Sequence, residues 1–354
     1  GCLQGISGRT EIVLVATYYS NSDIRLEERP RPQLGEDETL LKIHASGICG
    51  SDLMEWYRRD KVPLVLGHEV AGEIVEVGNA VNNVSVGDRI VASHHVPCLE
   101  CRYCQRGNET MCRTLKTTDF DPGGFSQYVR LPEINTRLGL YNIPDGLSYE
   151  EASFAEPLAC VLRGQRRANL RKGDVVAVIG SGMSGVLHIA LAKATDAEMI
   201  IASDINKKKL PWAKKFGADN VTQDSSEIAE ILEEKTGRKA DIVILTTGHP
   251  EAVLAGFSAA DDGATILLFA PSDPETTVPI DISRHFFKRD ITVTTTYAGS
   301  PEDHREALQL IAAKRVPVKE MITHRIGLEE IQSGFDLVKS GTDSLKVMVE
   351  PQKE

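Results

Sequence analysis

The sequence predicts an α/β protein with two domains, a doubly wound parallel sheet and a distorted β-barrel. In the middle of the chain, apolar strand-like runs alternate with helical segments, which is the pattern of a parallel sheet covered by helices. Toward the N-terminus, short strand-like runs are separated by Gly and Asn-Asn breaks, which favours an irregular β-domain over a helical bundle. A length of 354 residues also fits two cores better than one.

The first domain is expected to span residues 1–149. Its strand candidates begin near Ile12 and end near Ile143. Short apolar or alternating runs bounded by turn residues indicate half-buried strands. The clearest candidates are residues 40–45, 70–77, 88–91 and 126–131.

A helix is expected to begin at the end of the first domain. Ser148-Tyr149-Glu150-Glu151 fits a capping box, in which a hydroxyl and a carboxylate three residues later bind free backbone N–H groups. The helix should reach Glu156-Pro157, where proline forces a break or a fresh start because it lacks a backbone N–H. A further helical segment then runs to about residue 170.

The second domain, residues 150–297, carries the doubly wound sheet. Residues 175–179 are all apolar, as expected for a strand buried on both faces, and a helical pattern follows over 183–193. Further strands are expected at 199–203, 241–245, 265–269 and 291–296. The tail, residues 298–354, is expected to return to the first domain. It contains helical patterns at 301–313 and 328–340 and strand patterns at 324–326 and 344–349.

Composition and charge argue against several classes of function. A formal net charge of −11 disfavours nucleic acid or an anionic membrane surface as the main partner. No apolar run approaches the ~18 residues of a transmembrane helix, and no secretory signal is visible. Seven cysteines, four of them clustered, favour metal binding over a disulfide framework. We therefore expect a cytoplasmic, reducing location.

Four of the cysteines form a compact group in the first domain. Cys98, Cys101, Cys104 and Cys112 lie within the segment 95–113. Four thiolates at this spacing can close a tetrahedral zinc site that has no open position. Such a zinc would be structural and would cross-link a lobe too small to bury its own core. The alternative is a disulfide-paired or adventitious cluster.

A coenzyme motif follows the strand at 175–179. Gly180-Ser181-Gly182-Met183-Ser184-Gly185 is a G-x-G-x-x-G between a strand and a helix, and Asp204 ends the next strand, nineteen residues past Gly185. Glycines let the backbone approach a pyrophosphate, which rests on the helix N-terminus. Asp204 would bind the ribose hydroxyls and repel a 2′-phosphate, so the motif predicts NAD. Lys207, Lys208 and Lys209 weaken this preference slightly.

A second metal site is predicted around Cys49 and His68. Thiolate, imidazole and carboxylate side chains bind catalytic zinc, which needs three protein ligands and an open position. For either residue alone, a buried thiol or a core histidine would be the better interpretation. Beside a four-cysteine site and a coenzyme motif, catalytic zinc is favoured. Glu69, Glu156 and Cys160 are candidates for the third ligand.

These motifs together resemble the zinc-dependent medium-chain dehydrogenase/reductase family, which includes alcohol, polyol (sorbitol) and threonine dehydrogenases. Gly67-His68-Glu69-Val70-Ala71-Gly72 looks like its zinc signature, and Cys49-Gly50-Ser51-Asp52 is similar to the segment with its first ligand. The Cys98–Cys112 spacing looks like its structural zinc lobe. The resemblance covers the chain after about Glu11. It implies a GroES-like catalytic domain made from both chain ends around a central Rossmann domain.

The resemblance also implies a ligand set for the catalytic zinc. Cys49 and His68 match two ligands, and Glu156 matches the third, which is glutamate in the polyol-like branch. Cys160 would then be a core residue. Glu69 matches a carboxylate that binds zinc directly or by exchange with water.

Other matches concern proton transfer and the coenzyme. Asp52 matches an acid that orients the zinc-bound histidine, and Ser51 matches the hydroxyl that takes the substrate proton. Lys209 matches a lysine near the adenosine ribose. Met54 stands where many relatives have a proton-relaying histidine, so ribose hydroxyls with water, Glu55 or His44 would have to take that role. His94 and His95 resemble pocket-lining positions of relatives, and Trp56, Tyr57 and Asp119 are further candidates for lining the site.

The predicted function is a zinc-dependent oxidoreductase that transfers a hydride from a secondary alcohol to NAD, giving a ketone and NADH. A polyol, sugar alcohol or cyclitol is the expected small-molecule substrate. Alternatives are a threonine or amino-alcohol dehydrogenase and a simple alcohol dehydrogenase. A zinc-knuckle binding module is a remote alternative, against which the acidic balance and the coenzyme motif argue. Relatives form dimers or tetramers, so a homodimer or homotetramer is expected, with no nucleic-acid or membrane partner.

Overall fold

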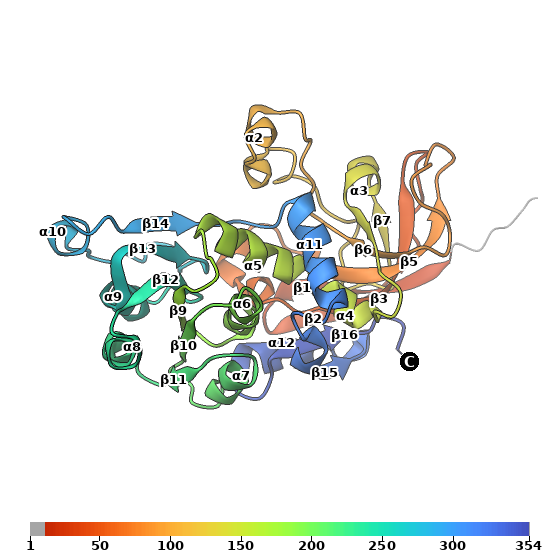
Figure 1. The fold of residues 1–354 in the computed structure, drawn as a ribbon. Coiled ribbons are helices and arrows are strands. Elements are labelled where there is room, and N and C mark those ends of the chain that lie inside the picture. The colour runs from red at the N-terminus through yellow and green to blue at the C-terminus, as the bar shows by residue number, and fades with distance from the viewer. Residues whose placement is uncertain (1–10, 354) are drawn as a thin grey trace, which may run out of the picture.

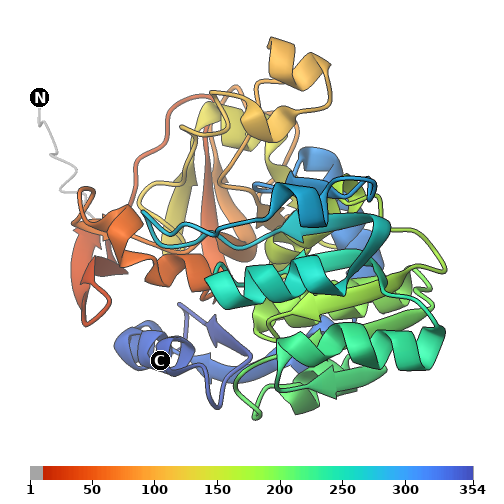
Figure 2. The ribbon, with the colours of Figure 1, turned by 90° about the vertical axis from the view of Figure 1, so that its left-hand side faces the viewer.

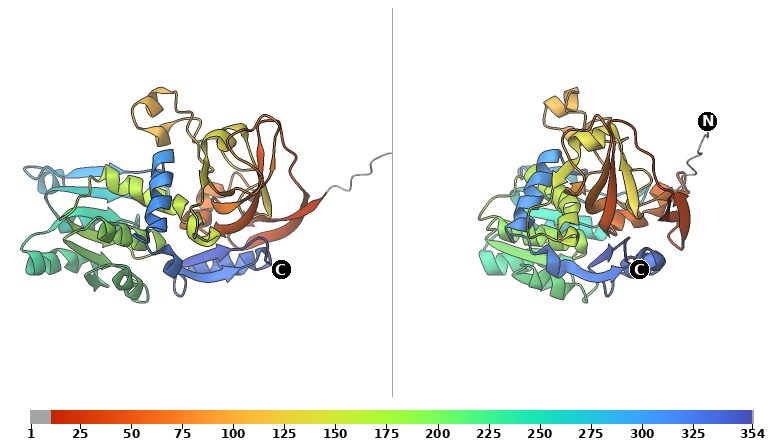
Figure 3. Two further views of the ribbon diagram at one scale, coloured as in Figure 1. Left: turned by 45° about the vertical axis from the view of Figure 1, so that its right-hand side comes forward. Right: turned by 90° about the vertical axis from the view of Figure 1, so that its right-hand side faces the viewer.

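The computed structural model describes residues 11–353 and places two sheet systems side by side (Figure 1). Helices α5 (Ala155–Arg167) and α11 (Pro301–Ala312) pack against each other between them (Figures 1 and 3). A large apolar core joins residues of α5, α6 and α11 to Ala45, Ala71 and Val91 of the first domain's sheet. The two domains therefore share a core, which fixes the site between them. Within residues 11–353, no helix is both long and apolar enough to cross a membrane.

The second domain holds a six-stranded sheet in the order β11-β10-β9-β12-β13-β14, and every neighbouring pair is parallel. Its strands are β9 (Val175–Ile179), β10 (Met199–Ser203), β11 (Asn220–Thr222), β12 (Ala240–Leu245), β13 (Ala260–Leu268) and β14 (Thr292–Thr295). The predicted doubly wound architecture is confirmed. The strand order reverses beside β9, and ligands bind at the carboxyl ends of the strands at such a point.

Helices cover both faces of this sheet (Figure 2). The helices are α6 (Met183–Ala194), α7 (Leu210–Lys215), α8 (Ile228–Thr236), α9 (Pro250–Ala259) and the short α10 (Ile282–His285). Val175, Ala177 and Ile179 of β9 share a core with α8 and α9, whereas Val176 and Val178 pack with α6 and α7. Because alternate side chains of a strand face opposite sides, burial on both faces requires the uninterrupted apolar run seen in the sequence.

The first domain is built from a three-stranded and a seven-stranded sheet, both mostly antiparallel. One has the order β2-β1-β4, and the other has the order β15-β16-β3-β5-β6-β8, with β7 also paired to β3. The strands are β1 (Ile12–Ser20), β2 (Asp23–Pro30), β3 (Thr39–Gly47), β4 (Leu64–Val65), β5 (Glu69–Val77), β6 (Arg89–Ala92), β7 (Tyr128–Leu131), β8 (Leu140–Asn142), β15 (Ile322–Ile326) and β16 (Lys346–Val349). The helices are α1 (Glu55–Arg58), α2 (Arg102–Gln105), α3 (Glu133–Leu138), α4 (Tyr149–Ser153) and α12 (Ile331–Ser340), with 3₁₀ turns η1 (Gly50–Leu53), η2 (Glu109–Met111), η3 (Ser225–Glu227), η4 (Val318–Met321) and η5 (Leu328–Glu330) along the chain.

The C-terminal tail completes the sheet of the first domain. Strand β16 pairs antiparallel with β3, so that Met348 lies opposite Gly47. In Figure 3 the blue C-terminal strands lie against the red N-terminal ones. The domain boundaries 1–149, 150–297 and 298–354 stay a prediction.

The helix start at Ser148 is confirmed, but the predicted break at Pro157 is wrong. The Glu151 N–H donates to Ser148 Oγ and the Ser148 N–H donates to Glu151 Oε2, both at 3.1 Å, which completes the capping box. Helix α4 ends at Ser153 and α5 begins at Ala155, so the break falls at Phe154. Pro157 lies in the first turn of α5, where backbone N–H groups have no partner within the helix and proline is tolerated.

Candidate active site

Strand pairing brings Cys49, His68 and Glu69 together. Strands β3 and β5 are antiparallel neighbours, and Gly47 at the end of β3 lies opposite Glu69 at the start of β5. The residues just beyond these strand ends therefore meet. One donor atom from each of Cys49, His68 and Glu69 lies within 4.8 Å of the other two. A thiol, an imidazole and a carboxyl group at this separation fit the donor preferences of zinc.

Asp52 fixes the orientation of the His68 ring. Its carboxylate is fully buried in η1, where Oδ2 accepts the Cys49 N–H at 3.0 Å and Oδ1 lies 3.3 Å from His68 Nδ1. Burial raises the pKa of Asp52, but His68 and the Cys49 N–H outweigh it and hold that pKa below its usual value. With Nδ1–H directed at Asp52, the lone pair of Nε2 is left for a metal ion.

Glu69 faces a lysine that the sequence analysis did not single out. Glu69 and Lys346 form an ion pair in which both side chains are only 1% exposed. Lys346 also donates to the Ile48 carbonyl at 3.2 Å. A Cβ at Gly47 would lie 2.0 Å from Glu69 Oε2 and 2.7 Å from Lys346 Cε, so the pair requires glycine there. Glu69 Oε1 is buried with no hydrogen-bond partner, which fits a place beside a metal ion.

Glu156 lies close to these residues but outside their 4.8 Å group. It is in the first turn of α5 and is 7% exposed, and its Oε1 lies 3.6 Å from Cys160 Sγ one turn further on. Burial and the nearby Glu69, opposed by His68, raise the pKa of Glu156 to about 7. The structure thus puts Glu69 in the donor group with Cys49 and His68, and places Glu156 as a nearby acid. The choice of Glu156 as third ligand stays a prediction.

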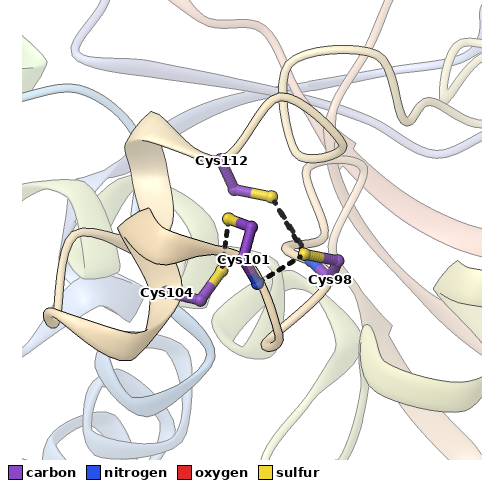
Figure 4. A group of neighbouring side chains, drawn as sticks. All are labelled: Cys98, Cys101, Cys104 and Cys112. Carbon is purple, nitrogen blue, oxygen red and sulfur yellow. Dashed lines mark hydrogen bonds between the residues drawn. The ribbon is translucent and has the colours of Figure 1, made fainter.

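The four predicted ligands of the structural zinc come together in a lobe around α2, which projects from the rest of the molecule (Figures 1 and 4). The Sγ atoms of Cys98, Cys101, Cys104 and Cys112 all lie within 4.8 Å of one another. Backbone N–H groups of residues 100 and 101 lower the pKa of Cys98, which favours the thiolate that a metal needs. All six cysteines within residues 11–353 are free of disulfides, and Cys2 lies outside the described residues. The alternative of a disulfide-paired cluster is therefore not supported.

The glycines of the coenzyme motif lie where the backbone passes too close to other atoms for a side chain to fit. Gly180 has φ +101°, and a Cβ on Gly185 would lie 1.9 Å from the Gly180 carbonyl. Gly182 is the N-cap of α6, and Met183 and Ser184 form its first turn. The tight strand-to-helix turn therefore leaves the N-terminus of α6 open to a pyrophosphate.

Asp204 is held in place beside this turn. Its Oδ2 accepts the Ser181 N–H and its Oδ1 accepts the Asn206 N–H, both at 2.8 Å, while Lys209 Nζ lies 3.9 Å from Oδ2. An open hollow of ≈ 810 Å³ adjoins it. Residues that line the hollow include Ile205, Gln223, Asp224, Ser225, Leu254 and Ser258. The hollow has no local signature in the sequence, because its walls come from the turns after β10 and β11, from η3 and from α9.

Two of the predicted pocket residues, His94 and His95, lie beside the metal-binding group. The His94 ring centroid is 5.1 Å from that of His68 and 3.8 Å from that of His95. His95 Nε2 lies 3.0 Å from the hydroxyl of Tyr297, which the sequence analysis did not name as a pocket residue. Trp56 and Tyr57 are exposed on α1.

His44 and Glu55, the two side chains considered for the proton relay, make no hydrogen bond within residues 11–353 that would support that role. His44 stacks on Tyr149 at 4.4 Å, and its pKa is lowered by burial and by Lys42, so its surroundings are those of β3 and α4. Among the described residues, neither His44 nor Glu55 has a hydrogen bond to Ser51. Ribose hydroxyls with water stay the third alternative, and the choice among the three stays a prediction.

A doubly wound sheet with a pyrophosphate-binding turn, next to a buried thiol, imidazole and carboxyl group, defines a metal-dependent oxidoreductase that uses a dinucleotide. Comparison with known proteins agrees. The family model of an alcohol dehydrogenase GroES-like domain matches residues 35–145, and that of a zinc-binding dehydrogenase matches residues 185–313.

Individual relatives match over nearly the whole chain. Sorbitol dehydrogenase of Ovis aries is 32% identical over 342 residues, which covers 94% of both chains. D-xylulose reductase A of Aspergillus oryzae is 32% identical and covers 90% of this chain and 91% of the relative. A Sinorhizobium meliloti 1021 structure, described as a zinc-binding dehydrogenase bound to NADP, has a TM-score of 0.83 at 28% identity, with coverage of 96% of this chain and 100% of that one. The chain belongs to the zinc-dependent medium-chain dehydrogenase family.

Proposed function

We propose that this protein oxidises a secondary alcohol of the polyol type to a ketone and transfers the hydride to NAD. The observation that supports this most is the donor group of Cys49, His68 and Glu69, in which Asp52 leaves His68 Nε2 directed at a metal. The sorbitol dehydrogenase and D-xylulose reductase relatives support a polyol substrate. The imidazoles of His94 and His95 and the phenol of Tyr297 lie beside the donor group, and such polar groups support a hydroxylated substrate over a simple alkanol.

The chain's own residues have separable roles in this reaction. Zinc, when bound, polarises the substrate oxygen and lowers the pKa of its hydroxyl group. Cys49 and His68, together with Glu69 or Glu156, would hold it. Ser51, two residues after Cys49, accepts the proton of the substrate hydroxyl and releases its own proton toward water. Asp52 holds the His68 ring and its tautomer.

The coenzyme site is proposed to take NAD in preference to NADP. Gly180, Gly182 and Gly185 let the backbone approach the pyrophosphate, with Met183 and Ser184 at the start of α6. Asp204 receives the ribose hydroxyls, and its charge opposes a 2′-phosphate. Lys209 beside Asp204 contacts the adenosine ribose. The NADP-bound Sinorhizobium relative makes this preference a point to be measured.

A substrate panel tests the proposal. Zinc-replete enzyme is assayed by NADH absorbance with sorbitol, xylitol, myo-inositol, L-threonine and butan-2-ol, each with NAD and with NADP. We expect a polyol to give the highest kcat/KM, and NAD to exceed NADP by more than about tenfold, because juxtaposed like charges cost several kcal/mol. Highest efficiency with L-threonine would favour the amino-alcohol alternative. No oxidation of any alcohol would contradict the proposal.

We propose a homodimer or homotetramer in a reducing, cytoplasmic compartment. Strand β14 is the edge of the parallel sheet, and three of its four residues are exposed, so a second copy could extend the sheet there. The free cysteines support a reducing compartment. Light scattering on purified enzyme should give two or four chains, and a monomer at micromolar concentration would contradict the assembly.

A further inference from the structure

Tyr297 lies in a short connection that is fixed on several sides. The connection joins β14 to α11. Just before it, the Arg167 guanidinium of α5 donates to the Thr295 carbonyl at 2.7 Å. Just after Tyr297, Ala298 packs against the cysteines of the projecting lobe. A Cβ on Gly299 would lie 2.6 Å from the Cβ of Ala159, so the backbone also touches α5. The position of Tyr297 is therefore set by α5 and by the lobe.

From this position Tyr297 reaches across to the first domain. Its hydroxyl lies 3.0 Å from His95 Nε2. The His95 ring lies tilted against that of His94, and the His94 ring lies beside that of the proposed metal ligand His68. Burial raises the pKa of Tyr297, and Tyr57, Cys160 and Glu156 raise it further, so the phenol lies among the groups around the proposed zinc. The hydroxyl of Tyr297 and the ring of His95 thus lie beside the donor group at which the substrate alcohol is proposed to bind.

The pair is uncharged at neutral pH. Burial, with the nearby His68, lowers the pKa of His95 to about 4, and the pKa of Tyr297 is above its usual value. The Tyr297 O–H can therefore donate to a neutral His95 Nε2, and its oxygen keeps lone pairs for a second hydrogen bond. A phenol that donates to an imidazole is polarised and becomes a better acceptor. A neutral acceptor favours a substrate that carries a hydroxyl group at this position over a substrate that carries a carboxylate or a phosphate there.

We propose that Tyr297, held by His95, determines specificity by accepting a hydrogen bond from a second hydroxyl of the alcohol substrate. This inference rests on the proposed function and adds a residue that selects polyhydroxylated substrates over simple alcohols. The selection is physical, because an alcohol without the second hydroxyl cannot donate this hydrogen bond to the Tyr297 oxygen in the bound complex.

The test compares two alcohols in matched variants. Wild type and Tyr297→Phe are assayed with butane-2,3-diol and with butan-2-ol, and with sorbitol as a longer polyol. We expect Tyr297→Phe to lower kcat/KM about tenfold for the diol and sorbitol, mainly through KM, and to leave butan-2-ol within about twofold. The ratio of diol to mono-alcohol efficiency is the readout, since a merely structural role would change both alike.

Two further variants distinguish an effect of the Tyr297–His95 hydrogen bond from a general effect of losing a polar side-chain group. Tyr128→Phe removes a phenol hydroxyl on β7 that has no hydrogen bond among the described residues, and it should leave the ratio unchanged. His95→Phe keeps a ring against His94 but removes the acceptor of Tyr297. It should lower the ratio as Tyr297→Phe does, and the double variant should add little more.

Each other outcome overturns the inference. An equal effect of Tyr297→Phe on the diol and the mono-alcohol, or no effect on either, shows that the phenol does not select a second hydroxyl. A wild-type enzyme that oxidises butan-2-ol as efficiently as butane-2,3-diol shows the same. Failure to oxidise any alcohol contradicts the proposed function itself, and the inference falls with it.

Discussion

Replacing Cys49 or His68 by Ala is expected to lower kcat by at least about a thousandfold while NADH still binds. A Lewis acid contributes several kcal/mol to stabilising the charge that develops on the substrate oxygen, and each ~1.4 kcal/mol is a factor of ten in rate. Loss of either donor leaves fewer than three protein ligands. The coenzyme site is built from the turn after β9 and from Asp204, neither of which these substitutions touch. Steady-state kinetics with the best polyol and NADH fluorescence titration give the two readouts.

Cys160→Ala is the matched control for this expectation. Cys160 is a thiol on α5 with its Sγ 3.6 Å from Glu156, and it lies outside the Cys49, His68 and Glu69 donor group. Its loss should change kcat by less than about tenfold, since it removes only one weak contact to Glu156. If Cys160→Ala is inactive and Cys49→Ala is active, the two cysteines have been assigned the wrong way round.

Replacing Lys346 by Met should destabilise the protein by about 3–5 kcal/mol. Removing one member of a buried ion pair leaves the other charge uncompensated, and that is the cost typical of such a change. Both side chains of the Lys346–Glu69 pair are 1% exposed, and the lysine also satisfies the Ile48 carbonyl. Urea unfolding of the zinc-replete enzyme measures the change in the free energy of unfolding.

A second variant keeps this expectation falsifiable. Adding Glu69→Gln to Lys346→Met removes the stranded charge and should recover part of the lost stability. Lys172→Met is the surface control. Its partner is Asp196 and its side chain is 79% exposed, so the loss should be below about 1 kcal/mol. A similarly small loss in Lys346→Met, with no recovery in the double variant, would show that the buried pair contributes nothing to the fold.

The parts of the fold and site that the sequence reveals are those encoded locally. The four cysteines of the lobe, the glycines before α6 and Asp204 after β10 are short patterns whose spacing reflects one turn or one strand-to-helix connection. Ser148 likewise signals its helix through a residue three positions away. The break predicted at Pro157 is wrong because the sequence does not distinguish a proline in the first turn of a helix from a proline at a helix break.

The residues that the sequence does not reveal act through contacts between distant segments. Lys346 is 298 residues from the Ile48 carbonyl that it binds, and Tyr297 is 202 residues from His95. Neither residue belongs to a local sequence pattern, so only the fold reveals its partner. Gln223 beside Ile205 depends in the same way on the pairing of β10 with β11. The relative roles of Glu69 and Glu156 also depend on how β5 and α5 approach each other.

Zinc content per chain tests the central claim most directly. Metal analysis of purified wild type, Cys49→Ala, His68→Ala and Cys98→Ala counts zinc independently of any substrate. We expect two zinc ions per chain in wild type and one in Cys49→Ala and in His68→Ala, with NADH binding retained. We expect Cys98→Ala to lose the zinc of the lobe instead. Two zinc ions per chain in both Cys49→Ala and His68→Ala would show that neither residue holds a metal and would contradict the claim.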